Sequence, residues 1–110
     1  MMIENEAREY NLRQVRLMEN KASAFMQQQI SLRNLIDSLE ALLSVLQNPA
    51  EEFVQQMQKW WSTLEIIYSV CLDQERSPSQ NEAEKIYYAI EQILLLVIDY
   101  KKELEKEEQV

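Results

Sequence analysis

The chain has 110 residues, which is enough for one domain with a hydrophobic core, and we expect residues 1–110 to form a single helical domain. It contains no glycine, no histidine, two prolines and one cysteine, and its net charge is −8. Glycine is the residue on which phosphate-binding loops depend. Histidine is the commonest general base and metal ligand. The composition therefore argues against an enzyme, and we expect no catalytic residue, no metal site and no cofactor.

The negative charge is concentrated in the second half of the chain. Residues 50–110 carry thirteen acidic and six basic residues, which gives −7 of the net −8. Such a surface repels nucleic acids and anionic membranes and attracts basic proteins. The longest apolar run, at 93–98, is far shorter than the ~20 residues that span a bilayer. We therefore expect a basic protein partner, no nucleic acid, no membrane, and a cytoplasmic location.

The first half of the chain predicts two helices. A single helix through residue 46 would be roughly 67 Å long, too long for a domain of this size, so we place a turn near 26–31 with Ser31 as the N-cap. The helices are then 3–26 and 31–47. The apolar face of the first is Ile3, Ala7, Tyr10, Leu17, Met18, Ala22 and Phe25, and that of the second is Leu32, Leu35, Ile36, Leu39, Leu42, Leu43 and Leu46.

The second half predicts helices at 49–75 and 79–107. Asn48 would cap the third helix with Pro49 in its first turn. Ser77 or Ser79 would cap the fourth, with Gln80 or Glu82 three residues further on. Four helices with short connections favour an all-α, four-helix antiparallel bundle. In that bundle, facing residues have numbers that sum to about 98 between the second and third helices and to about 154 between the third and fourth.

Two pairs of adjacent aromatic residues lie on the third and fourth helices. Neighbouring helical residues point about 100° apart, so one residue of each pair faces the core. We expect Trp60 and Tyr87 to be buried. Trp61 and Tyr88 then lie near the edge, where exposed tryptophan and tyrosine are favoured for binding a partner.

The run 93–98 is apolar on all sides of its helix, so it must be covered on more than one side. Either the fourth helix is the central one of the bundle, or a homodimer covers Leu95 and Ile98. Cys71 follows Val70 on an apolar face, and we expect a buried, unreactive thiol.

Acidic residues of the second half gather at two ends of the predicted bundle. One end holds Glu51, Glu52 and acids between 103 and 108, and the other surrounds the turn at Pro78. Acids at helix starts also stabilise the helix dipole, which accounts for several of them without a partner. We expect the partner at the Pro78 end, because charges held by a rigid turn lose less entropy on binding. The predicted partner-binding residues are Asp73, Glu75, Glu82, Glu84, Trp61 and Tyr88.

Two stretches are similar to a pattern found in small bacterial proteins: ISLRNLIDSLEALL at 30–43 and WSTLEIIY at 61–68. With its size, acidity and helical character, the chain resembles the small cytoplasmic immunity proteins of bacterial toxin–immunity pairs, of the contact-dependent inhibition and nuclease colicin types. The resemblance implies that the protein neutralises a basic toxin domain, a nuclease, by stoichiometric occlusion, with carboxylates where the toxin expects phosphates. The alternative is a homo-oligomeric helical structural or adaptor protein with no toxin partner.

Overall fold

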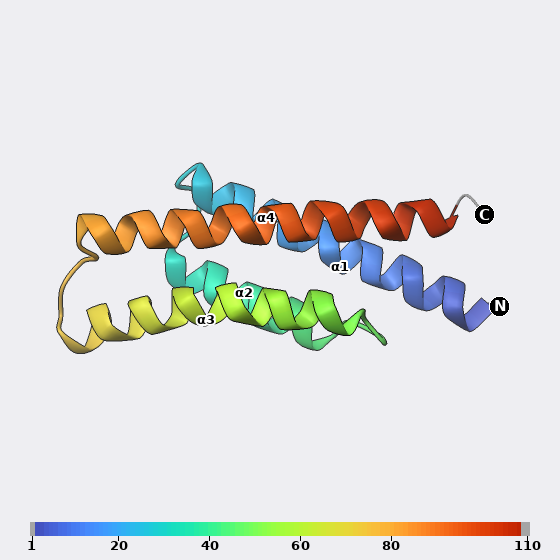
Figure 1. Cartoon of the computed structure of the whole chain (residues 1–110), viewed down its shortest axis with the longest axis horizontal. Helices are drawn as coiled ribbons and strands as arrows, with labels where there is room; N and C mark the ends of the chain where they lie inside the picture. The colour runs from blue at the N-terminus through green and yellow to red at the C-terminus, as the bar shows by residue number, and fades with distance from the viewer. Residues whose placement is uncertain (1, 109–110) are drawn as a thin grey trace.

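The computed structural model describes residues 2–108 and the side chains of residues 5–106. Its four helices are α1 (Met2–Met26), α2 (Leu32–Ser44), α3 (Glu51–Asp73) and α4 (Gln80–Glu108), and the described residues contain no strand. Successive helices run in opposite directions, so that both ends of the chain lie at the same end of the molecule (Figure 1). The predicted all-α, four-helix antiparallel bundle is confirmed.

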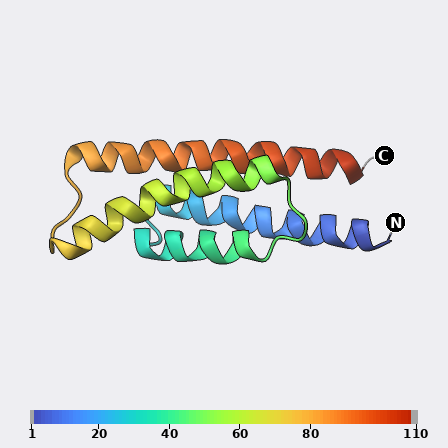
Figure 2. The same ribbon diagram turned by 60° about the horizontal axis from the view of Figure 1, so that its bottom comes forward.

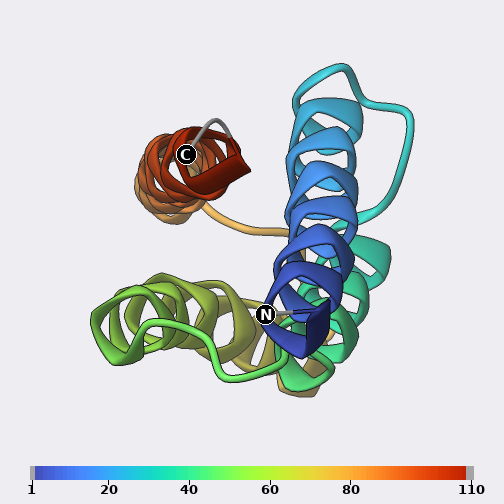
Figure 3. The ribbon, with the colours of Figure 1, turned by 90° about the vertical axis from the view of Figure 1, so that its right-hand side faces the viewer.

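The helices form a ring rather than a central helix with three around it. Each helix packs against the next one in the chain, and α1 closes the ring against α4 (Figure 3). The molecule measures 51 × 22 × 21 Å, and α4 runs close to its long axis. Toward the 74–79 connection, α3 and α4 splay apart (Figure 2). This connection and the helix ends beside it form one extremity of the bundle.

Without glycine, each connection places another residue in the left-handed region of the backbone. Gln28, Asn48 and Glu75 have φ values of 61°, 49° and 50°. At the end of α1, the N–H of Gln29 donates to the carbonyl of Ala24 and that of Gln28 to the carbonyl of Phe25. This is the Schellman pattern, whose left-handed position glycine usually occupies. The same pair of bonds ends α3. The N–H of Glu75 donates to the carbonyl of Leu72, and the N–H of Arg76 donates to the carbonyl of Cys71.

The turn predicted near 26–31 is confirmed, with Ser31 as the N-cap of α2. The connection between α2 and α3 differs from the prediction. α2 ends at Ser44, three residues before the predicted end, and α3 begins at Glu51 with Ala50 as an N-cap that makes no side-chain bond. Asn48 does not cap, because its left-handed backbone departs from the extended conformation of an N-cap residue.

The core draws residues from all four helices. Of the face predicted for α1, Met18 and Ala22 are buried and Phe25 packs against the core, but Leu17 is 46% exposed. Leu12 and Val15 are buried as well, on a stripe that includes Asn11, whose polar side chain interrupts the apolar pattern. Ile3 lies outside the residues whose side chains are described. The buried apolar residues of α2, α3 and α4 are Leu35, Ile36, Leu39, Phe53, Met57, Leu64, Ile67, Cys71, Ile86, Ala89, Ile90, Ile93, Val97, Tyr100 and Leu104.

The predicted helix registers agree with two cross-helix contacts. The rings of Phe53 and Tyr100 stack with centroids 4.2 Å apart, and their numbers sum to within one of the predicted value. The indole Nε1 of Trp61 donates to the carbonyl of Ile36 at 2.9 Å, with the same agreement. These contacts join α3 to α4 and to α2.

Candidate interaction site at the hairpin end

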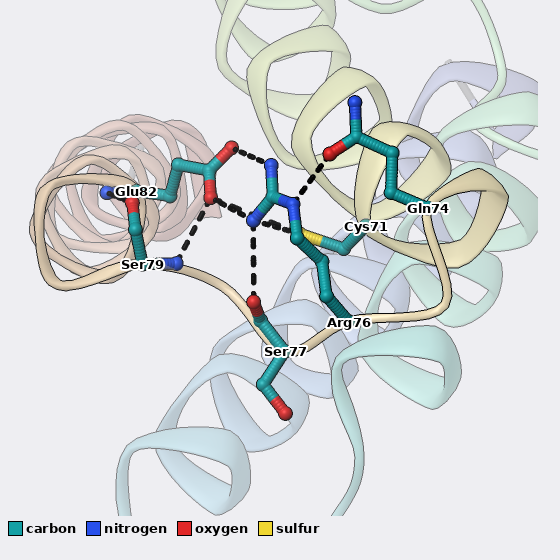
Figure 4. Close-up of polar contacts among 6 residues, drawn as sticks. All are labelled: Cys71, Gln74, Arg76, Ser77, Ser79 and Glu82. Carbon is teal, nitrogen blue, oxygen red and sulfur yellow. Dashed lines mark hydrogen bonds and ion pairs between the residues drawn. The ribbon is translucent and has the colours of Figure 1, made fainter.

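The α3–α4 connection is locked by a two-point ion pair. Arg76 Nη1 and Nη2 lie 2.6 and 3.1 Å from the two carboxylate oxygens of Glu82, and Nη1 also donates to the carbonyl of Ser77 (Figure 4). A two-point guanidinium–carboxylate pair fixes orientation as well as distance. We call residues 73–84, which include this pair, the hairpin end. Sequence reasoning missed the role of Arg76, and the only signal was an arginine six residues before an acid across a proline turn.

Glu82 also completes the N-terminus of α4. The backbone N–H of Ser79 donates to Glu82 Oε1 at 2.9 Å, and the N–H of Glu82 donates to Ser79 Oγ at 3.2 Å, which is the predicted capping box. The Arg76 guanidinium and then the Ser79 N–H lower the pKa of the Glu82 carboxyl from 4.5 to about 2. Its side chain is only 21% exposed. Glu82 is therefore committed to holding the turn, and a partner meets it less readily than predicted.

The other three predicted carboxylates are presented to solvent. Asp73 is the last residue of α3, Glu75 occupies the left-handed position after it, and Glu84 lies in the first turns of α4. All three residues are exposed. They surround a backbone fixed by the Schellman bonds of α3, the capping box of α4 and the Arg76–Glu82 pair. The hairpin end is thus a rigid frame that carries exposed negative charge.

Cys71 lies beneath this frame. It is buried, as predicted, with its Sγ 3.7 Å from Arg76 Nη1 and 3.9 Å from Glu82 Oε1 (Figure 4). The thiol therefore packs against the ion pair from the core side and presents no surface for chemistry.

The two predicted aromatic anchors have different surroundings. Trp61 is half-buried, and its indole is bonded to α2, so it holds the two helices together rather than facing a partner. Tyr88 is 55% exposed and meets Trp60 edge-on, with ring centroids 5.6 Å apart. Tyr87, predicted to be in the core, is exposed, because the inward-facing positions of this part of α4 are Ile86, Ala89 and Ile90.

Trp60, Tyr88 and Glu84 line a surface groove of about 370 Å³ between α3 and α4, together with Thr63, Asn81 and Lys85. Lys59 extends over the Trp60 ring, with its Nζ 4.7 Å from the ring centroid. The groove brings Glu84 and Tyr88 of the predicted set together, and Trp61 is not part of it. Asp73 and Glu75 lie at the adjoining turn.

The remaining chemistry of the described residues is sparse. Among the described side chains, those of residues 5–106, no group of three or more acidic or cysteine residues is arranged to hold a metal ion. Within residues 2–108, every helix is too short or too polar to cross a membrane. Comparison of the chain with family models, with curated proteins and with solved structures finds no match.

Proposed function

We propose that the protein is an immunity-type protein, which binds a basic toxin domain in the cytoplasm and neutralises it by stoichiometric occlusion. The observation that supports the proposal is the hairpin end, where Asp73, Glu75 and Glu84 are exposed around a turn fixed by the Arg76–Glu82 pair. The partner class follows from charge, because a surface of exposed carboxylates on an acidic protein attracts a basic one.

The carboxylates of the hairpin end are held on a fixed backbone. A flexible charged segment must be ordered when it binds, and the lost entropy opposes association. At the hairpin end, that cost is met on folding by backbone and side-chain bonds within residues 71–82. For a nuclease toxin, such carboxylates take the place of substrate phosphates and also accelerate encounter.

A second candidate function is a homo-oligomeric helical structural or adaptor protein. A separate observation favours it, namely the exposure of Leu95 on the outer side of α4. The two candidates use different surfaces, so each has its own test.

The immunity-type function is tested by capture from extracts of the source cells with matched charge variants. The wild-type chain should retain a basic protein in equal amount. The variant Asp73→Asn/Glu75→Gln/Glu84→Gln should retain it poorly, whereas Glu6→Gln/Glu9→Gln/Glu40→Gln, which removes the same charge from exposed positions on α1 and α2, should retain it as the wild type does. Equal capture by both variants would contradict the assignment of the hairpin end. The absence of any basic protein bound at equal amount would contradict the function itself.

A further inference from the structure

We propose that a second copy of this chain packs against the outer side of α4, in an antiparallel contact centred near Gln92. Two large apolar side chains of α4, Tyr88 and Leu95, are 55% and 57% exposed. They are seven residues apart, so they lie two turns from each other on one stripe of the helix. Ile98 and Leu96 beside them are half-buried. This surface adjoins the hairpin end, since Glu84 lines the same groove as Tyr88, but the proposal does not depend on a toxin partner.

A two-fold axis through this stripe makes it complementary to itself. In an antiparallel contact between two copies of α4, facing residues have numbers that sum to a constant. An axis near Gln92 gives a sum of about 184, which brings Tyr88 of each copy next to Leu95 and Leu96 of the other. One symmetric contact thus covers both exposed side chains of this stripe, Tyr88 and Leu95, in each copy.

The charges on the same side of the stripe support this axis. Lys85 and Asp99 both face α3: Lys85 lines the groove with Trp60, and Asp99 lines another with Phe53. Both residues are exposed. Because a two-fold axis brings the same flank of each helix together, Lys85 of one copy faces Asp99 of the other, and the pair occurs twice.

One group opposes the contact and sharpens its test. Glu91 is exposed and precedes the axis by one residue, so the two copies bring their Glu91 carboxylates close together. Like charges at short range disfavour association. A contact made largely by one helix of each copy is also small, which places it among weak interfaces. We therefore expect weak association of the wild-type chain and tighter association of Glu91→Gln.

Sedimentation equilibrium of the full chain between about 10 μM and 1 mM, a range set around the expected weak affinity, tests the proposal. The wild type should shift from monomer to dimer, and Leu95→Ser should remain monomeric, while Leu17→Ser, at an exposed position of α1, should dimerise normally. Lys85→Asp should weaken the dimer about tenfold or more, as expected when a facing charge pair becomes repulsive. The charge swap Lys85→Asp/Asp99→Lys should restore it, whereas Arg13→Asp, an equal charge change on α1, should leave it unaffected.

Two results would overturn the proposal. One is a wild-type chain that stays monomeric throughout the concentration range. The other is a dimer that Leu95→Ser does not weaken or whose loss in Lys85→Asp is not restored by the swap, since either would place the contact elsewhere. Circular dichroism of each variant confirms that its helices are intact, so that a changed affinity reports on the surface.

Discussion

Asn11 is the buried polar residue that joins α1 to the α2–α3 connection. Its Nδ2 donates to the carbonyl of Gln47 at 2.7 Å, and its Oδ1 accepts from the N–H of Gln47 at 2.8 Å. The side-chain amide thus satisfies both backbone groups of a residue that lies outside any helix. This explains how a polar residue is tolerated in the core stripe of α1.

Replacing Asn11 with alanine removes both bonds and leaves backbone groups unsatisfied next to the core. We expect Asn11→Ala to lower the free energy of unfolding by about 1–3 kcal/mol. Urea unfolding measures this change, with Asn20→Ala at an exposed position of the same helix as the control. If the two variants are equally stable, the connection is not held by Asn11.

Glu82 makes stability depend on pH in a defined window. Its carboxyl has a pKa of about 2 in the folded chain and returns toward 4.5 when unfolded. A lowered pKa means that the charged form favours folding, so its contribution is complete above pH 4.5 and is lost as the pH falls toward 2. Glu82→Gln should therefore melt at a lower temperature than the wild type at pH 7, and the difference should shrink between pH 4.5 and 2.

Thermal melts across pH 2–7 measure the Glu82 effect, with Glu84→Gln as the exposed control two residues away. The control should differ little from the wild type at any pH, because exposed charges contribute little to stability. A Glu82→Gln variant whose deficit stays constant down to pH 2 would show that the ion pair is not its cause.

At the scale of helices, α1 and α3 each end at a residue with a left-handed backbone conformation. This conformation raises the free energy of the folded chain, and glycine would avoid that cost. Gln28 has φ 61° at the Schellman position of α1 and is exposed. A residue with a Cβ pays about 1 kcal/mol or more in this region, and glycine does not. We expect Gln28→Gly to raise the free energy of unfolding by up to about 1 kcal/mol, whereas Gln27→Gly, one residue earlier, should lower it. Urea unfolding of the two variants decides, and a destabilised Gln28→Gly would contradict the assigned backbone geometry.

The sequence allowed the helices and their registers to be predicted well, for physical reasons that are local. Apolar spacing placed α3 and α4 to within two residues at their ends. Ser31 was identified as a cap, and Ser79 was one of the two candidates for the cap of α4. Prediction failed at Asn48, which was expected to cap α3. Asn48 takes a left-handed backbone conformation instead, next to Gln47, whose backbone N–H and carbonyl are both bonded to Asn11.

For the candidate site, periodicity identified which carboxylates lie at the hairpin end but not how they are used. Asp73, Glu75 and Glu84 are exposed there as predicted. Glu82 is held by Arg76, whose approach depends on the path of the turn, and helical spacing says nothing of that path. Trp61 was expected near an edge of the bundle. It lies between α2 and α3 instead, where its indole N–H donates to a backbone carbonyl of α2. A pattern of side chains along the sequence does not reveal a bond to the backbone.

At the scale of the whole molecule, the distribution of charge and the elongated shape both favour the hairpin end as the surface that a partner meets. Most of the net charge of −8 lies in the half of the chain that forms α3, α4 and their connection. The 51 Å length of the bundle presents the hairpin end at one extremity, opposite the two ends of the chain (Figure 1). A partner bound there meets a rigid acidic tip, so electrostatic steering should dominate the rate of encounter.

The association rate constant with the captured basic partner, measured against ionic strength, tests the central claim most directly. We expect Asp73→Asn/Glu75→Gln to associate roughly threefold to tenfold more slowly than the wild type at low salt and to depend less steeply on ionic strength, because steering charges act on the association rate. Glu6→Gln/Glu9→Gln, which removes the same charge from exposed positions of α1, should leave both the rate and the slope close to those of the wild type. A rate and a salt dependence that are unchanged in Asp73→Asn/Glu75→Gln would contradict the claim that the hairpin end receives the partner.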